Sequence, residues 1–150
     1  MTFRVPPLVY LAVFALIAWG LSMLLPALDV EWAMMTVLAV GFMATGIFLL
    51  LFAVGAFARA GTTVNPIEPG DAETLVTSGL YRFSRNPMYL AMALILIGAA
   101  FLASNLASFL APALFVCVIT MTQIKPEERA LKELFGDTFY QYCQRTRRWI

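Results

Sequence analysis

The 150-residue sequence contains no histidine and only two cysteines, Cys117 and Cys143. Without histidine it lacks the commonest general base and the commonest zinc ligand. The two cysteines are too far apart to form a disulfide framework and match no metal-ligand spacing, so no metal site is expected. Internal repeats and low-complexity tracts are also missing, and nothing in the sequence indicates a nucleic-acid partner.

Charged residues are scarce and unevenly placed. They make up 13% of the sequence, against 61% hydrophobic residues, whereas soluble domains are about a quarter charged. The mean hydropathy is +0.83. No Asp, Glu, Lys or Arg occurs in the ranges 5–28, 32–58 and 86–124. This composition excludes an ordinary soluble domain and predicts an all-α integral membrane protein.

The lengths of the uncharged runs predict four transmembrane helices. A helix needs about 20 apolar residues to cross the roughly 30 Å hydrocarbon core, and the first two runs provide one crossing each. The third run would be about 58 Å long as one helix, so it holds two crossings. Ser104 and Asn105 are the expected turn of this tight hairpin, because both residues cap helices and favour turns. The predicted spans are about residues 6–28, 32–57, 87–104 and 106–124.

All ten Lys and Arg residues fall on one side of this four-span topology. The other side receives only Asp29, Glu31 and the uncharged turn of the hairpin. The positive-inside rule therefore predicts that both termini are cytoplasmic, at the inner (plasma) membrane if the protein is bacterial. The first apolar stretch exceeds a signal-peptide core and lacks a small-x-small cleavage site, so it is expected to be retained as a span. The sequence does not indicate an oligomeric state.

A long polar loop, residues 59–85, leads into the third span and is expected on the cytoplasmic side. Loops of this length are usually functional or disordered, and function is favoured because this one runs into a cluster of Tyr and Arg. Asn86 is the expected N-cap of the third span, and Pro87 occupies its first helical position.

A final amphipathic helix is predicted over residues 126–143, where Pro126 opens it and Gly136 bends it or ends its first half. It is expected to lie on the membrane surface or over the mouth of the bundle. Glu128 and Lys132 have the spacing of an i,i+4 ion pair. The arginines that follow, Arg145, Arg147 and Arg148, are expected at anionic lipid headgroups.

Polar residues gather at the start of the third span and the end of the fourth. Each of these residues has a simple structural explanation. Asn86 can cap a helix, Arg85 can anchor at the membrane surface, Tyr81 and Tyr89 can belong to an aromatic belt, and Glu127 and Glu128 can complement the helix dipole. Together they predict more, because the hairpin returns both ends to one membrane face, with roughly 8–10 Å between helix axes. Paired charges beside aromatic rings at a helix start suit a zwitterionic or cationic ligand.

An ordered set of motifs runs through the same region. Leu75-Val76-Thr77-Ser78-Gly79-x-Tyr81 precedes Arg85-x-Pro87-x-Tyr89, then the acidic pair 127–128, then Phe135-Gly136 with Tyr140. Over about residues 70–145 this set resembles the isoprenylcysteine carboxyl methyltransferase family, which is grouped with the phospholipid N-methyltransferases. The resemblance implies an integral-membrane enzyme that binds S-adenosylmethionine outside a Rossmann domain, and the sequence has no GxGxxG loop after a strand.

The resemblance also implies the binding residues. The cofactor site would consist of Glu73, Thr74, Leu75, Val76, Tyr81, Asn86, Pro87, Met88, Tyr89 and Glu127. The family usually has His where this chain has Asn86. Gln123 occupies the position where the prenylcysteine enzymes place a substrate-binding Arg, so it is the candidate substrate residue, without a charge for a substrate carboxylate. Arg85 and Glu128 are candidates for catalysis, although in-line methyl transfer can rest on positioning and electrostatics alone, and no catalytic residue is assigned.

The predicted function is therefore S-adenosylmethionine-dependent methyl transfer (EC 2.1.1 type) to a lipophilic or small acceptor at the bilayer, with the cofactor on the cytoplasmic side. Two alternatives remain open. One is a sterol-reductase-like membrane reductase that uses a dinucleotide, for which the chain looks short. The other is a non-enzymatic small transporter or structural subunit, and transporters generally carry an ionisable residue within a span, which these runs lack. The sequence does not distinguish O-, N- and S-methylation or name the acceptor.

Overall fold

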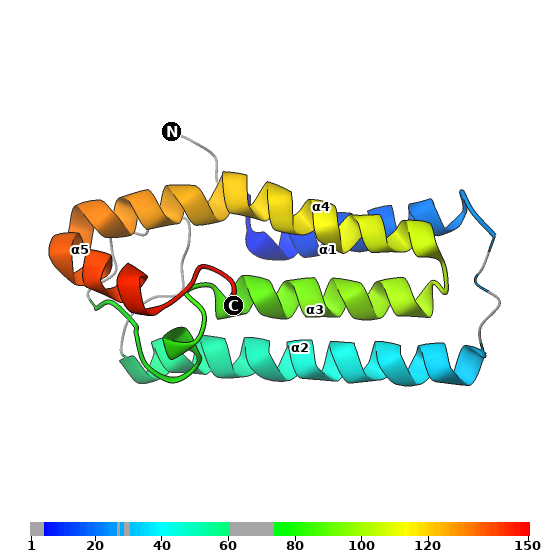
Figure 1. Cartoon of the computed structure of the whole chain (residues 1–150), viewed down its shortest axis with the longest axis horizontal. Coiled ribbons are helices and arrows are strands. Elements are labelled where there is room, and N and C mark those ends of the chain that lie inside the picture. The colour runs from blue at the N-terminus through cyan, green and yellow to red at the C-terminus, as the bar shows by residue number, and fades with distance from the viewer. Residues whose placement is uncertain (1–4, 27, 29–30, 61–73) are drawn as a thin grey trace.

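The computed structural model describes residues 5–26, 28, 31–60 and 74–150. These residues form helices and no strand, which confirms the all-α prediction. The long helices lie side by side (Figure 1). They are α1 (Pro7–Ser22), α2 (Trp32–Ala60), α3 (Pro87–Leu102), α4 (Leu110–Ile119) and α5 (Lys125–Arg145). Shorter elements are the 3₁₀ turns η2 (Gly79–Arg82) and η3 (Leu106–Phe109) and the π-helical turn η4 (Thr120–Ile124).

Two helical stretches are long and apolar enough to cross a membrane, namely Trp32–Arg59 with 28 residues and Leu106–Arg145 with 40. The other two apolar helices, α1 and α3, have 16 residues each. Such a helix is about 24 Å long, which is less than the roughly 30 Å of the hydrocarbon core. The four-span topology therefore stays a prediction for α1 and α3.

Glycines allow α2 and α3 to approach closely. A Cβ atom on Gly46 would lie 2.7 Å from the carbonyl oxygen of Ala91, and one on Gly98 would lie 2.8 Å from that of Ala39. No real Cβ fits at such distances, so these two positions require glycine. A Cβ on Gly41 would meet nothing within 4 Å. Gly46 therefore marks the face of α2 that packs against α3, whereas Gly41 does not.

The predicted hairpin turn after α3 is confirmed. Asn105 caps η3, because its side-chain oxygen accepts a 2.9 Å hydrogen bond from the backbone N–H of Ala107. Its side-chain nitrogen also reaches the chain that follows α1. There it donates to three backbone carbonyl oxygens, those of Ser22, Leu25 and Pro26. One buried asparagine thus joins the α3–η3 turn to the end of α1.

The last helix, α5, covers the predicted range 126–143 and has Pro126 in its first turn, but no break separates it from α4, because α4, η4 and α5 form one continuous helical stretch. A proline inside an α-helix clashes with the carbonyl group four residues earlier, here Thr122, and removes one backbone hydrogen bond. Thr122 lies in η4, and a π-helical turn is a known way to absorb such a disturbance. The predicted bend at Gly136 is confirmed by its non-helical φ of 49° and ψ of −122°.

After this bend, α5 doubles back toward the start of α3 (Figure 1). The residues that follow, Thr146–Ile150, are called the return segment here. The backbone N–H of Arg85 donates to the carbonyl oxygen of Arg147 at 2.9 Å, and the side-chain nitrogen of Asn86 donates to that of Arg148 at 2.9 Å. Asn86 is at the N-cap position, yet its side chain makes no capping hydrogen bond. Its predicted capping role is wrong, because the amide holds the return segment instead.

Candidate functional site

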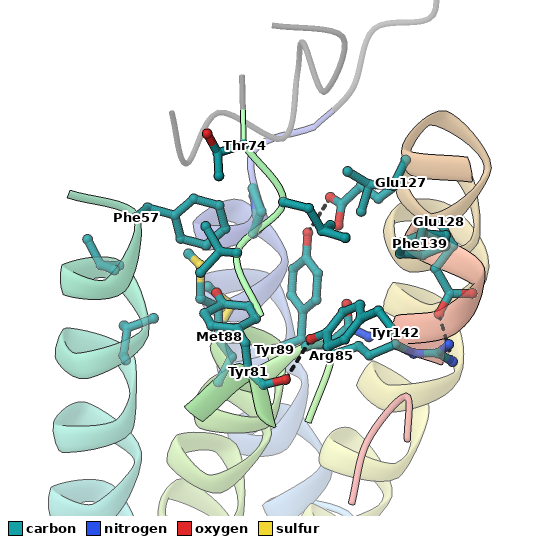
Figure 2. Close-up of a pocket in the computed structure, with 18 of the residues that line it drawn as sticks. Phe57, Thr74, Tyr81, Arg85, Met88, Tyr89, Glu127, Glu128, Phe139 and Tyr142 are labelled. Carbon is teal, nitrogen blue, oxygen red and sulfur yellow. Dashed lines mark hydrogen bonds and ion pairs between the residues drawn. The ribbon is translucent and has the colours of Figure 1, made fainter. Parts of the chain in front are cut away.

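A cavity of about 380 Å³ lies where the start of α3 faces α5 (Figure 2). Ligand pockets in proteins start at about 300 Å³, so this cavity can hold one small molecule. Its walls come from segments far apart in the sequence, including the start of α1, the second half of α2, the segment before α3, and α5.

Most of the predicted site residues line this cavity. The cofactor-binding candidates in its wall are Thr74, Leu75, Val76, Tyr81, Asn86, Met88, Tyr89 and Glu127. Both catalytic candidates, Arg85 and Glu128, line it as well. Pro87, the first residue of α3, is buried and is not in the wall. Glu73 lies outside the described residues.

Gln123 lies outside the cavity wall. It is 2% exposed, and its side-chain nitrogen donates to the carbonyl oxygen of Val5 at 2.9 Å. Its side-chain oxygen is buried without a hydrogen-bond partner in the described part of the chain. Pro6 and Pro7, next to Val5, do line the cavity. Gln123 therefore contacts the segment next to the cavity and not the cavity itself.

A hydrogen bond between two predicted residues connects α3 to α5 at the cavity. The hydroxyl of Tyr89 donates to Oε1 of Glu127 at 2.6 Å, and Figure 2 shows the two side chains pointing toward each other. This distance is typical of a hydroxyl bound to an ionised carboxylate. The expectation that the hairpin brings Tyr89 and the acidic pair together is confirmed.

Glu128 joins two arginines that are far apart in the sequence. Its Oε1 lies 3.2 Å from Nη2 of Arg85, and its two oxygens accept hydrogen bonds of 3.0 Å and 2.6 Å from Nε and Nη2 of Arg148. These hydrogen bonds to Glu128 raise the pKa of Arg148 above its ordinary value. No described ion pair joins Glu128 to Lys132, so that predicted pair is wrong. Glu128 thus also holds the guanidinium group of Arg148, and the binding of Arg148 to lipid headgroups stays a prediction.

Aromatic rings form another part of the wall. The hydroxyl of Tyr142 donates to the carbonyl oxygen of Tyr81 at 2.7 Å. The rings of Phe57 and Tyr81 meet edge to face, with centroids 5.3 Å apart. Burial raises the pKa of Tyr81 well above its ordinary value, so this phenol stays neutral and its ring remains an apolar wall. Faces of such rings attract cations.

The rest of the wall is apolar, and most of it lies beyond the predicted motifs. Sequence reasoning missed Pro6, Pro7, Leu8, Leu50, Val54, Phe57, Met92, Leu131, Phe139 and Tyr142. Most of them lie within apolar runs, where one Leu or Val looks like any other. Only their positions in the folded structure identify them as wall residues. The cavity is thus amphiphilic, with acidic and basic groups at one part of the wall and hydrocarbon at the other.

Comparison with known proteins identifies the family of the chain. No solved structure matches the chain. An uncharacterized protein of Haemophilus influenzae is 38% identical over 63 residues, which cover 42% of this chain and 100% of that protein. A sequence model of the phospholipid methyltransferase family matches residues 34–138, a stretch that includes both Tyr89 and Glu127. The chain therefore belongs to the phospholipid methyltransferase family of integral-membrane methyltransferases, which includes the isoprenylcysteine carboxyl methyltransferases.

Proposed function

We propose that this protein is an S-adenosylmethionine-dependent methyltransferase and that the cofactor binds in the cavity between α3 and α5. The observation that carries the proposal is the Tyr89–Glu127 hydrogen bond of 2.6 Å, in the wall of a cavity that also gathers the predicted cofactor residues. Glu73 and Pro87 belong to the proposed site on the resemblance alone.

The chemistry of the wall fits such a cofactor. S-Adenosylmethionine carries an ammonium, a carboxylate, a sulfonium and ribose hydroxyl groups. Glu127 can accept from the ammonium or the hydroxyls, and the rings of Tyr81 and Phe57 suit the sulfonium. Nε of Arg85 is buried without a hydrogen-bond partner among the described residues, and an oxygen of the ligand would satisfy it. The backbone N–H groups at the start of α3 favour an anion.

The residues of the chain would act by positioning. When bound, the cofactor supplies an electrophilic methyl group on its sulfonium. The wall residues hold and orient the two reactants in line and exclude water, which lowers the barrier through proximity and electrostatics. A thiolate, amine or carboxylate acceptor needs little help from a base, and this agrees with a sequence without histidine.

The acceptor is proposed to be lipophilic, or small, and to reach the cavity from the bilayer. Leu8 comes from α1, Leu50 and Val54 from α2, and Met92 from α3, and all four add hydrocarbon to the same wall. Such a wall suits an acyl or prenyl chain. The accompanying topology is four spans, with the cofactor side and both termini in the cytoplasm.

Isothermal titration of the detergent-purified protein with S-adenosylmethionine tests the proposal. We expect a dissociation constant between about 1 μM and 1 mM, the usual range for enzyme substrates. No heat of binding at millimolar ligand would overturn it. A titration with NADPH addresses the reductase alternative, and binding of NADPH in place of S-adenosylmethionine would favour it. A screen of radiolabelled methyl transfer to membrane lipids and small thiols then identifies the acceptor.

A further inference from the structure

A second pocket, of about 480 Å³, shares Tyr142 with the first cavity and lies between η2 and the end of α5. Its wall carries Arg82, Arg145, Gln141 and three threonines, Thr77, Thr138 and Thr146. We propose that this pocket binds the phosphate group of an anionic phospholipid. This binding site is separate from the proposed methyl-transfer cavity and goes beyond the proposed function.

The charge of this pocket differs from that of the first cavity. Its described wall contains two arginines and no carboxylate. Within the described residues, neither Arg82 nor Arg145 takes part in an ion pair, whereas Arg85 and Arg148 both pair with Glu128. The two positive charges in this pocket therefore have no described counterion. The guanidinium group presents its N–H donors in a fork that matches phosphate oxygens, which makes phosphate the best-fitting anion.

Hydrogen bonds hold the two walls of the pocket together. The hydroxyl of Tyr142 donates to the backbone carbonyl of Tyr81, next to Arg82 in η2. The backbone N–H of Thr146, which is 5% exposed, donates to the carbonyl of Tyr142 at the end of α5. The hydroxyl of Thr146 lies 3.4 Å from the carbonyl oxygen of Arg82. Arg82 and Arg145 thus project from backbones that are fixed relative to each other, so binding orders little of the chain.

The surroundings point to a lipid as the source of the phosphate. The chain belongs to a membrane-bound family, and Arg82, Arg85 and Arg147 lie next to the start of α3. Phe83, the residue after Arg82, is 76% exposed, as expected of an aromatic side chain at a lipid–water interface. Basic side chains at such an interface attract anionic headgroups.

Native mass spectrometry of detergent-purified protein mixed with phosphatidylglycerol and phosphatidylcholine tests the proposal without any cofactor. The variant Arg82→Gln/Arg145→Gln is compared with Arg129→Gln/Arg147→Gln, which removes the same charge from two exposed side chains outside both pockets. We expect the wild type and the control to retain phosphatidylglycerol preferentially. The pocket variant should bind it about thirtyfold more weakly, at about a fivefold change for each headgroup-bound arginine.

Three results would overturn the proposal. They are no preference for phosphatidylglycerol in the wild type, an equal loss in both double variants, and full displacement of the lipid by millimolar inorganic phosphate. The last would make free phosphate the ligand. Melting temperatures of both variants show whether each is folded. Because the assay needs neither S-adenosylmethionine nor methyl transfer, its failure is distinguishable from failure of the proposed function.

Discussion

Two buried asparagines mark the two ends of α3, and they sit in very different surroundings. Asn86 is 9% exposed and Asn105 is 1% exposed. Both donate their side-chain amide to backbone carbonyls that lie more than 60 residues away in the sequence. At the Asn105 end the hydrogen bonds are neutral, and the turn contributes no residue to either cavity. At the Asn86 end, acidic and basic side chains surround a cavity of about 380 Å³.

The difference separates a structural end from a functional end. Neutral hydrogen bonds to backbone carbonyls satisfy buried polar groups and add to stability. Partly buried charges are a poor means of gaining stability, because desolvation offsets much of their attraction. Arg85 and Glu128 are only 14% and 18% exposed. Since stability does not call for such groups, their presence at one end of a largely uncharged protein fits the charged ligand that we propose.

The sharpest test of this division is Glu127→Gln at the functional end. Glutamine keeps an oxygen that can accept from Tyr89 but removes the charge, so the fold should survive. Hydrogen bonds to charged groups are worth about 1.5–3 kcal/mol, so we expect affinity for S-adenosylmethionine to fall by roughly tenfold to 150-fold. Isothermal titration measures the affinity, and thermal unfolding checks the fold.

Arg147→Gln is the matched control, because the side chain of Arg147 is exposed and lines neither pocket. If both variants weaken cofactor binding equally, Glu127 only complements the helix dipole and the general charge balance, and the proposed site is wrong.

The next test is a substitution at the structural end, where stability should change and cofactor affinity should not. Asn105→Ala removes the donor to the carbonyls of Ser22, Leu25 and Pro26 and the cap on Ala107. Leaving these groups unsatisfied should lower the free energy of unfolding by about 2 kcal/mol, with cofactor affinity unchanged in the folded protein. Chemical denaturation in detergent measures the first quantity and isothermal titration the second.

Ser104→Ala changes the same turn but removes only a local 3.3 Å hydrogen bond to Phe101, so little loss of stability is expected. A loss of cofactor affinity in Asn105→Ala at full stability would show that the two ends of α3 are coupled, and the division would fail.

The sequence predicted the pairing across the hairpin because that pairing follows from chain geometry. A turn at Ser104 and Asn105 necessarily returns Tyr89 and Glu127 to one face, and the 2.6 Å hydrogen bond confirms it. The all-α fold and the bend at Gly136 were also predictable, because they depend on long apolar runs and on one glycine. The number of spans stays a prediction.

The return segment could not be predicted in the same way. Its hydrogen bonds with residues 84–86 are accepted by the backbone carbonyl oxygens of Arg147 and Arg148, which leave no side-chain pattern in the return segment. For that reason Asn86 looked like a helix cap, and the pairing of Arg148 with Glu128 was missed. The continuity of α4 with α5 was missed for another reason. Proline usually interrupts a helix, and nothing in the local sequence indicates that a π-helical turn will accommodate it.

Arg148→Gln gives the smallest expected effect and tests whether the return segment belongs to the functional end. Glu128 keeps Arg85 but loses the paired hydrogen bonds of 3.0 Å and 2.6 Å. With Arg85 as its only described partner, the carboxylate of Glu128 would then be held less firmly and would compete with the cofactor for that arginine. Since Arg148 is 37% exposed and solvent screens its charge, we expect only a threefold to tenfold loss of cofactor affinity, about 1 kcal/mol.

Arg148→Lys distinguishes charge from geometry. Lysine keeps the positive charge but cannot reproduce the two-pronged contact of a guanidinium group. Full recovery of affinity in the lysine variant would mean that Arg148 only balances charge. Recovery of less than half would mean that it positions Glu128, and through it Arg85, in the cavity wall. If neither variant changes cofactor affinity in the same titration, the return segment contributes to stability alone. The outermost residues at both ends of the bundle would then be structural.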